Sequence, residues 1–483
     1  MINQLEIIQK ATFLLENKNY VEVKNLLLNF IKNSKNIKID IKLYYSLYIA
    51  FDRLKEIKNA KKYLEKCLKI NEKNYVVLNN LANIFLKEGN LAKAEEFYLK
   101  SFKLKKDYLI VIINIAIFYQ NTGNLKSSKD FYLKAIELSP ERISIYFNLS
   151  RIDKNFLDDK KIEYLLSLMK NKKQEPAEMS YGYFLLAENE RKKKNFYLEI
   201  DYLEKANKYS FESMKEINKK TLNYWKRIIT KKYNSFEFDN PLKSSELKNY
   251  KPIFIIGLPR SGSTIIEALL TSGNQKIISL GESNIFNGII AKNFSDENKD
   301  NINLQFVENK ILEIFDNINL NKKNNLFVDK SLENFFYIDV ILKIFPNAIF
   351  INTTRNIKDN IIAIYKQSLT KLSWTHSIKD ILNYTDNYFK IMEYYEKKYP
   401  KKICNIKLEE LTFNIIETSK KLYAFCNLEW SENILNFYNR EDLLISTASN
   451  IQIRGGIERY DKKKYEPYKE LLKDYLNEYK WLN

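Results

Sequence analysis

The chain has 483 residues, of which 45% are hydrophobic and 29% are charged. This composition is typical of a folded soluble protein and excludes wholesale disorder, and the length suggests about two to four domains. The formal net charge is +19, from 79 Lys and Arg against 60 Asp and Glu. That excess fits either an anionic partner or a compositional bias. No nucleic-acid-binding motif is present, so we expect no nucleic acid as a partner.

Cysteine and histidine usage restricts the chemistry further. Cys67, Cys404 and Cys426 lie far apart, which argues against a disulfide framework and fits a reducing compartment. The single histidine, His376, excludes a multi-histidine metal site, and we expect no metal cofactor. The longest apolar stretch, near residues 109–119, is too short to span a membrane. The N-terminus lacks the pattern of a signal peptide, so we expect a cytoplasmic protein.

A repeat of 34 residues organises the first half of the chain. The tripeptide GNL at 89–91 recurs at 123–125, and FYLK at 97–100 recurs at 131–134. This period is typical of helix–turn–helix repeats of the tetratricopeptide kind. We therefore predict an all-α solenoid over residues 1–235 and a linker over 236–250. The concave face of the solenoid is the expected binding surface for a peptide or protein.

A candidate phosphate-binding loop opens the second half. The apolar run at 253–256 is typical of a buried parallel strand, and it leads directly into GLPRSGST and an amphipathic stretch. Strand, glycine-bearing turn and helix form the context in which backbone N–H groups bind phosphate. Ser263 replaces the lysine of a Walker-type loop, which disfavours γ-phosphate transfer. The predicted cofactor contacts of this loop are Gly257, Pro259, Arg260, Ser261, Gly262, Ser263 and Thr264.

The segment PIFIIGLPRSGST, followed by LGES, resembles the 5′-phosphosulfate loop of sulfotransferases. Over about residues 40–475, the chain resembles bacterial proteins that join tetratricopeptide repeats to a sulfotransferase domain related to tyrosylprotein sulfotransferases. The resemblance implies a sulfotransferase domain over residues 251–483, of P-loop-type α/β fold with a parallel sheet. It also implies 3′-phosphoadenosine 5′-phosphosulfate (PAPS) as co-substrate.

Two candidate catalytic residues follow from the same resemblance. The segment FVDKSLENFF matches the Asp-Lys and Asn-Phe pairs of the family at Asp329, Lys330, Asn334 and Phe335. Lys330 is then expected to stabilise the transferring sulfuryl group, with a surface salt bridge to Asp329 as the alternative. Glu282 matches the glutamate that acts as general base, and a solvent-exposed helix cap is its alternative. His376 does not match the histidine base of the small-molecule sulfotransferases.

The remaining expected cofactor contacts lie further along the chain. By resemblance, Arg355 holds the 3′-phosphate, and Asp359 also matches the family. The serine that usually accompanies this arginine falls at Ala363, which removes one phosphate hydrogen bond and weakens binding by about 1–3 kcal/mol. Ser368 and Tyr365 are candidates to compensate. The segment STASNIQIRGGIERY resembles the loop that covers the cofactor, and it adds Thr447, Ser449 and Arg454 to the expected contacts.

The leading hypothesis is a PAPS-dependent sulfotransferase that acts on a hydroxyl acceptor such as a protein tyrosine, with the repeats aiding acceptor recognition. Basic charge around a repeat groove suits an acidic tyrosine peptide, and glycan or small-molecule acceptors fit equally well. One alternative is a P-loop nucleotide-binding kinase. The other is an inactive or weakly active repeat scaffold, which Ala363 keeps open. The oligomeric state stays open, with a homodimer among the options.

Overall fold

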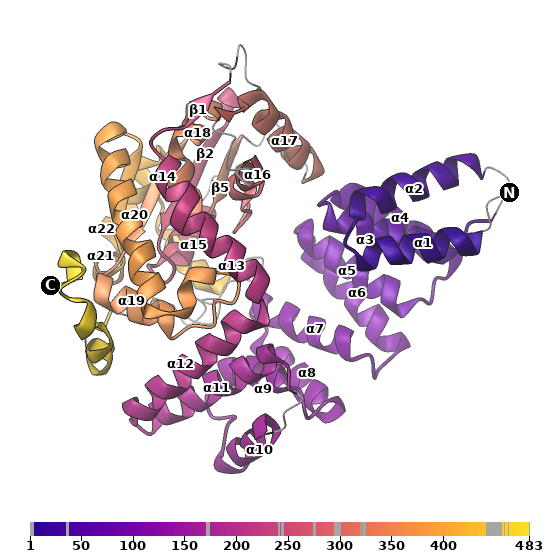
Figure 1. Ribbon diagram of the computed structural model, residues 1–483, viewed down its shortest axis with the longest axis horizontal. Coiled ribbons are helices and arrows are strands. Elements are labelled where there is room, and N and C mark those ends of the chain that lie inside the picture. The colour runs from indigo at the N-terminus through magenta and orange to yellow at the C-terminus, as the bar shows by residue number, and fades with distance from the viewer. Residues whose placement is uncertain are drawn as a thin grey trace. The chain divides into compact units, whose positions relative to one another are not determined.

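The structure is a computed structural model. It describes residues 4–34, 38–170, 174–239, 242, 246–273, 277–293, 301–318, 320, 325–440, 456–457, 459–461 and 463–482. The chain divides into two compact units, one of residues 1–140 with 314–320 and the other of residues 141–313 with 321–483 (Figure 1). The division at residue 140 falls inside the predicted solenoid of residues 1–235, whose bounds stay a prediction.

The described part of the first unit is built from helical hairpins. Its helices are α1 (Gln4–Glu16), α2 (Tyr20–Asn33), α3 (Ile41–Arg53), α4 (Ile57–Ile70), α5 (Tyr75–Lys87), α6 (Leu91–Leu104), α7 (Leu109–Thr122) and α8 (Leu125–Leu138). Helix α3 packs on α4, α5 on α6, and α7 on α8. Helices α3, α5 and α7 begin 34 residues apart, as do α4, α6 and α8. The predicted repeat is therefore confirmed.

Local chemistry sets where these helices begin and how closely they pack. The Asn90 side chain caps α6 by accepting a hydrogen bond from the Lys93 amide, and Asn124 caps α8 through the Ser127 amide in the equivalent way. Gly123 ends α7 with φ +93°, a left-handed conformation that suits glycine. Fully buried alanines such as Ala82, Ala94, Ala116 and Ala135 let neighbouring helices approach closely.

The second unit begins with helices and continues into a sheet. The helices are α9 (Ile143–Ile152), α10 (Asp159–Lys170), α11 (Pro176–Lys192), α12 (Phe196–Ser213) and α13 (Lys215–Asn223), followed by a π-helical turn (Tyr224–Ile229) and α14 (Thr230–Lys232). A buried ion pair joins α12 to the later part of the unit, with Lys366 Nζ 2.7 Å from Glu199 Oε1. Tyr468 donates to the other oxygen of Glu199 at 2.6 Å. Helix α12 thus packs against later segments of the same unit.

A five-stranded parallel sheet forms the centre of the second unit. Its strands are β2 (Lys251–Gly257), β3 (Ile278–Ser279), β5 (Leu326–Asp329), β6 (Ile349–Thr354) and β7 (Ile403–Lys407), in the order β3-β5-β2-β6-β7. A separate parallel pair joins β1 (Glu237–Phe238) to β4 (Asn301–Ile302). Because all five strands are parallel, their carboxyl ends meet at one edge, where α/β proteins bind ligands. The predicted α/β fold with a parallel sheet is confirmed.

Helices cover both faces of this sheet. The helices that follow β2 in the chain are α15 (Ser263–Thr271), α16 (Ile285–Asn293), α17 (Leu304–Asn317), α18 (Ile338–Ile344), α19 (Ile357–Tyr365), α20 (Ile378–Lys398), α21 (Leu408–Phe413) and α22 (Ile415–Phe425). On one face, Ile253 and Ile255 of β2 pack in a core with Leu269 of α15 and Leu422 of α22. Phe254, on the other face, stacks on Phe350 at 5.5 Å between ring centroids.

Short 3₁₀ turns complete the described residues, at Glu246–Asn249, Leu332–Tyr337, Ser373–His376, Glu432–Asn439, Glu466–Tyr475 and Lys480–Leu482. None of the helices within the described ranges combines the length and the apolar character that crossing a bilayer requires.

Candidate functional site

The loop between β2 and α15 depends on two glycines. Gly257 ends β2 with φ +132°, and a Cβ there would lie 2.5 Å from the carbonyl oxygen of Thr353 on the neighbouring strand. Gly262 adopts φ +96° immediately before α15 begins at Ser263. Only glycine combines this backbone conformation with such a close approach. The chain therefore turns tightly from the sheet edge into a helix N-terminus, which is the geometry that binds phosphate.

Side chains of β6 and α19 hold this loop in place. Ser261 Oγ and Thr353 Oγ1 lie 2.7 Å apart, Asn360 Nδ2 donates to the Pro259 carbonyl at 2.7 Å, and Arg355 Nη1 donates to the Arg260 carbonyl at 3.2 Å. Ser263 and Thr264 are buried in the first turn of α15. The structure thus brings together the predicted loop residues, Gly257 to Thr264, and Arg355.

Arg355 lies against two aromatic rings. Its guanidinium carbon is 5.3 Å from the ring centroid of Tyr460 and 4.9 Å from that of Tyr465, within the range of cation–π attraction. Its Nε atom is buried and makes no hydrogen bond to any of the described residues. Burial lowers the pKa of Arg260; Tyr465 opposes this, and the guanidinium groups of Arg355 and Arg151 add to it. These guanidinium groups favour an anion at the loop.

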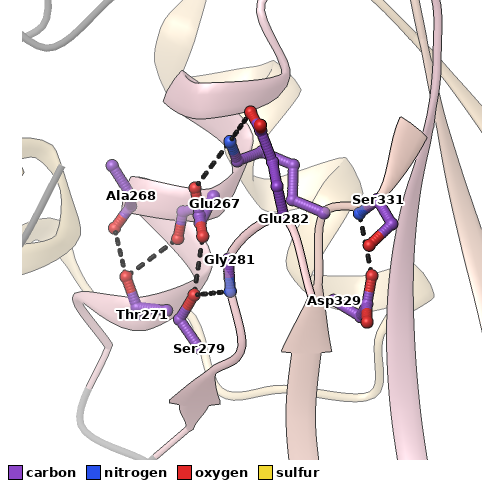
Figure 2. Close-up of polar contacts among 9 residues, drawn as sticks. Glu267, Ala268, Thr271, Ser279, Gly281, Glu282, Asp329 and Ser331 are labelled. Carbon is purple, nitrogen blue, oxygen red and sulfur yellow. Dashed lines mark hydrogen bonds and ion pairs between the residues drawn. The ribbon is translucent and has the colours of Figure 1, made fainter. Parts of the chain in front are cut away.

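The two predicted catalytic residues lie in contact. The side chain of Lys330, directly after β5, is only 1% exposed, and its Nζ lies 3.2 Å from Oε1 of Glu282 and 3.4 Å from Oε2 of Glu267. Figure 2 shows the carboxylates of Glu267 and Glu282 on separate segments, one on α15 and the other after β3. Lys330 is therefore a buried ammonium between two carboxylates, in place of a surface salt bridge with Asp329.

Asp329 accepts hydrogen bonds from two neighbouring loops. Its carboxylate accepts hydrogen bonds from the Ser283 hydroxyl, from the Ser331 amide at 2.8 Å and from Asn334 Nδ2 at 3.2 Å. Burial raises the pKa of Asp329, and the hydrogen bonds from Ser283 and Ser331 oppose that rise. Because Ser283 follows Glu282 in the chain, these bonds fix the loop after β3 against the loop after β5. Asp329 thus orients the segments that carry Glu282 and Lys330.

Sequence reasoning missed two carboxyl groups, Glu267 and Glu333. Glu267 is the acidic residue of the otherwise apolar run IIEALL in α15, and this pattern is the signal that could have identified it. Glu333 accepts a hydrogen bond from Asn287 Nδ2 at 3.1 Å. Burial raises the pKa of Glu333 to about 8; Trp374 opposes the rise, and the Glu282 carboxylate adds to it. The neighbourhood of Glu282 and Lys330 is therefore richer in carboxyl groups than the motifs indicate.

His376 is a core residue. Its ring packs edge-to-face on Phe211 at 5.9 Å between centroids, and neither ring nitrogen has a hydrogen-bond partner among the described residues. Burial lowers the pKa of His376 to about 4, against the opposing influence of Asp380. The imidazole is therefore neutral at pH 7.

The other predicted positions divide into two groups. Asp359 accepts a hydrogen bond from the Tyr460 hydroxyl, and Ala363 is 6% exposed within α19. Thr447, Ser449 and Arg454 lie outside the described residues. Within the described ranges, no group of three or more His, Cys, Asp and Glu side chains is arranged to hold a metal ion.

Comparison with known proteins agrees with both halves of this picture. Residues 252–432 match the model of the "Sulfotransferase family", and residues 41–74, 75–108 and 111–142 match that of the "Tetratricopeptide repeat". An uncharacterised protein of Aquifex aeolicus (strain VF5) is 27% identical over an alignment of 338 residues that covers 65% of this chain. The match spans only 43% of the length of that relative.

Solved structures that match parts of the chain include sulfotransferases and repeat proteins. The sulfotransferase domain of the Synechococcus PCC 7002 olefin synthase is 14% identical, with a TM-score of 0.32, over 49% of this chain and 97% of that one. Sulfotransferase STF1 from Mycobacterium tuberculosis H37Rv is 12% identical, with a TM-score of 0.29, over 59% of this chain and 93% of that one.

The family matches coincide with the two kinds of structure described above. The 34-residue helical repeats account for residues 41–142, and the parallel sheet with its glycine-bearing loop accounts for residues 252–432. Residues 41–142 of the chain thus match tetratricopeptide repeats, and residues 252–432 match the sulfotransferase family.

Proposed function

We propose that the protein transfers a sulfuryl group from PAPS to a hydroxyl acceptor, with a protein tyrosine as the leading candidate. The observation that carries the proposal is the placement of Lys330. Its buried ammonium lies 3.2 Å from the half-exposed Glu282 carboxylate. Lys330 follows β5, which pairs with β2, where the phosphate loop begins, and Glu282 follows β3, which pairs with the other side of β5. A cation, a base and an anion-binding loop at one sheet edge are what sulfuryl transfer requires.

The residues act as follows in this proposal. The loop from Gly257 to Thr264 holds the 5′-phosphosulfate with Arg260, and Arg355 holds the 3′-phosphate. Glu282 accepts the proton of the acceptor hydroxyl as its oxygen forms a bond to sulfur. The bond between sulfur and the bridging phosphate oxygen breaks, and the electron pair leaves with 3′-phosphoadenosine 5′-phosphate (PAP). Lys330 stabilises the charge that develops on the sulfuryl group and on that oxygen.

The repeats are proposed to contribute acceptor recognition. A hollow of about 400 Å³ lies in the first unit and is lined by side chains of α1, α3 and α5. Its lining includes the apolar residues Ile8, Ile41 and Val77 together with the polar residues Lys42 and Tyr45. A cation beside apolar side chains suits a peptide that carries both acidic and aromatic residues.

Sulfation of a defined peptide tests the function. The intact protein is incubated with PAPS and a peptide that holds one tyrosine among acidic residues, and the products are analysed by mass spectrometry. We expect the peptide to gain one sulfuryl group while one PAP is released, and a matched peptide with phenylalanine to gain none. Failure to release PAP from PAPS with this peptide, with simple phenols and with glycans would refute the proposal.

A further inference from the structure

We propose that Glu267 is a positioning residue for Lys330, one that keeps the ammonium in place while Glu282 acts as base. This inference rests on the proposed function. Lys330 Nζ lies between two carboxylates, 3.4 Å from Glu267 Oε2 and 3.2 Å from Glu282 Oε1. Its side chain is 1% exposed, and a buried ammonium without an anionic partner is strongly unfavourable. The two carboxylates therefore determine together where the ammonium lies.

The two carboxylates differ in how firmly they are held. The Glu267 side chain is 14% exposed and its second oxygen accepts a hydrogen bond from Ser279 Oγ at 2.6 Å. Ser279 Oγ in turn accepts the Gly281 amide proton at 3.1 Å, so that Glu267 is tied to the loop after β3 (Figure 2). The Glu282 side chain is 58% exposed. Glu267 is thus a fixed anchor and Glu282 a group free to meet an incoming acceptor.

This difference matters during the reaction. When Glu282 takes the acceptor proton, it loses its negative charge and most of its attraction for Lys330. Glu267 takes no part in this proton transfer and continues to hold the ammonium against the sulfuryl group. Without Glu267, Lys330 would rely on Glu282 alone, and the ion pair would compete with the proton transfer that Glu282 has to perform. This role explains why a mostly buried carboxylate, Glu267, lies in the apolar run of α15.

A double-mutant cycle tests whether Glu267 acts through Lys330. The rate of PAP release from PAPS is measured with water alone and with the tyrosine peptide, for Glu267→Gln, Lys330→Met and the double variant. We expect Glu267→Gln to lower kcat by about 10–30-fold with little change in KM for PAPS, and Lys330→Met by about 100–1000-fold. The double variant is expected to be no slower than Lys330→Met. Glu267→Asp should recover part of the rate.

Two further variants guard against effects on folding. Ser279 is exposed, and Ser279→Ala removes the hydrogen bond that anchors Glu267 while both carboxylate partners of Lys330 stay in place. It should lower kcat by about 2–5-fold in the wild type but not in Glu267→Gln. Glu393→Gln removes an exposed pair with Lys397, 2.6 Å away, and should leave kcat unchanged.

Each outcome separates the inference from the function on which it rests. Glu267→Gln could lower kcat by the same factor in the Lys330→Met background as in the wild type. That result would show a merely structural role and overturn the inference. So would a Glu267→Gln variant with the wild-type rate. If the wild type neither binds PAP in calorimetry nor releases it from PAPS, the proposed function fails and the inference with it.

Discussion

Glu282→Gln is expected to lower kcat for sulfuryl transfer to the tyrosine peptide by about a thousandfold, which is the loss typical of removing a general base. Glutamine keeps the size of the side chain and can still accept a hydrogen bond from Lys330, 3.2 Å away, but it cannot take the acceptor proton. The fold is expected to stay intact because the Glu282 side chain is 58% exposed. Affinity for PAP, which contains no sulfuryl group, should change little.

A neutralised glutamate elsewhere in the same unit provides the control. Glu410 is 52% exposed and lies 3.7 Å from Lys407, so Glu410→Gln removes a comparable charge away from Lys330. We expect it to keep the wild-type rate. A Glu282→Gln variant that retains more than about a tenth of the wild-type kcat would contradict the assignment of Glu282 as the base.

Gly257→Ala is expected to lower the free energy of unfolding by about 2–6 kcal/mol, because backbone strain and a steric clash act together. Gly257 has φ +132°, and the added Cβ would lie 2.5 Å from the Thr353 carbonyl oxygen and 3.0 Å from Thr353 Oγ1. Thr353 belongs to β6, which pairs with β2 in the middle of the sheet. Neither strand can move away without breaking that pairing, so the phosphate loop should be lost as well.

The matched control is Gly288→Ala in α16, where nothing lies within 4 Å of the added Cβ. Alanine is favoured over glycine inside a helix by about 1 kcal/mol, so this variant should be as stable as the wild type or slightly more stable. Urea denaturation followed by circular dichroism measures both variants. Equal stability of Gly257→Ala and Gly288→Ala would contradict the close approach of β2 to β6.

Features that depend on local sequence could be predicted. The repeats follow from a 34-residue period, because each unit is a helix pair of constant length with its own turn. The phosphate loop follows from a strand, a turn with glycines and a helix that are contiguous in the chain. The family resemblance predicts that Lys330 and Glu282 belong to one site. The parallel sheet explains their proximity, since each residue follows a strand that ends at the same edge.

Contacts between distant segments could not be predicted. The pairing of Glu267 with Lys330 depends on the strand order β3-β5-β2, which no local pattern encodes. The buried cluster of Glu199, Lys366 and Tyr468 joins three segments that are each more than a hundred residues from the next along the chain. The predicted solenoid of residues 1–235 includes Glu199, whereas the partners of Glu199 belong to the later part of the second unit.

Binding of PAP measured by calorimetry, with ATP as comparator, tests the central claim most directly. The account predicts that PAP binds and that ATP binds far more weakly. It also predicts that Arg355→Ala lowers the affinity for PAP by at least about tenfold, as expected when a charged hydrogen-bond donor to a phosphate is lost. Absence of PAP binding, or a preference for ATP that Arg355→Ala leaves unchanged, would contradict the sulfotransferase assignment.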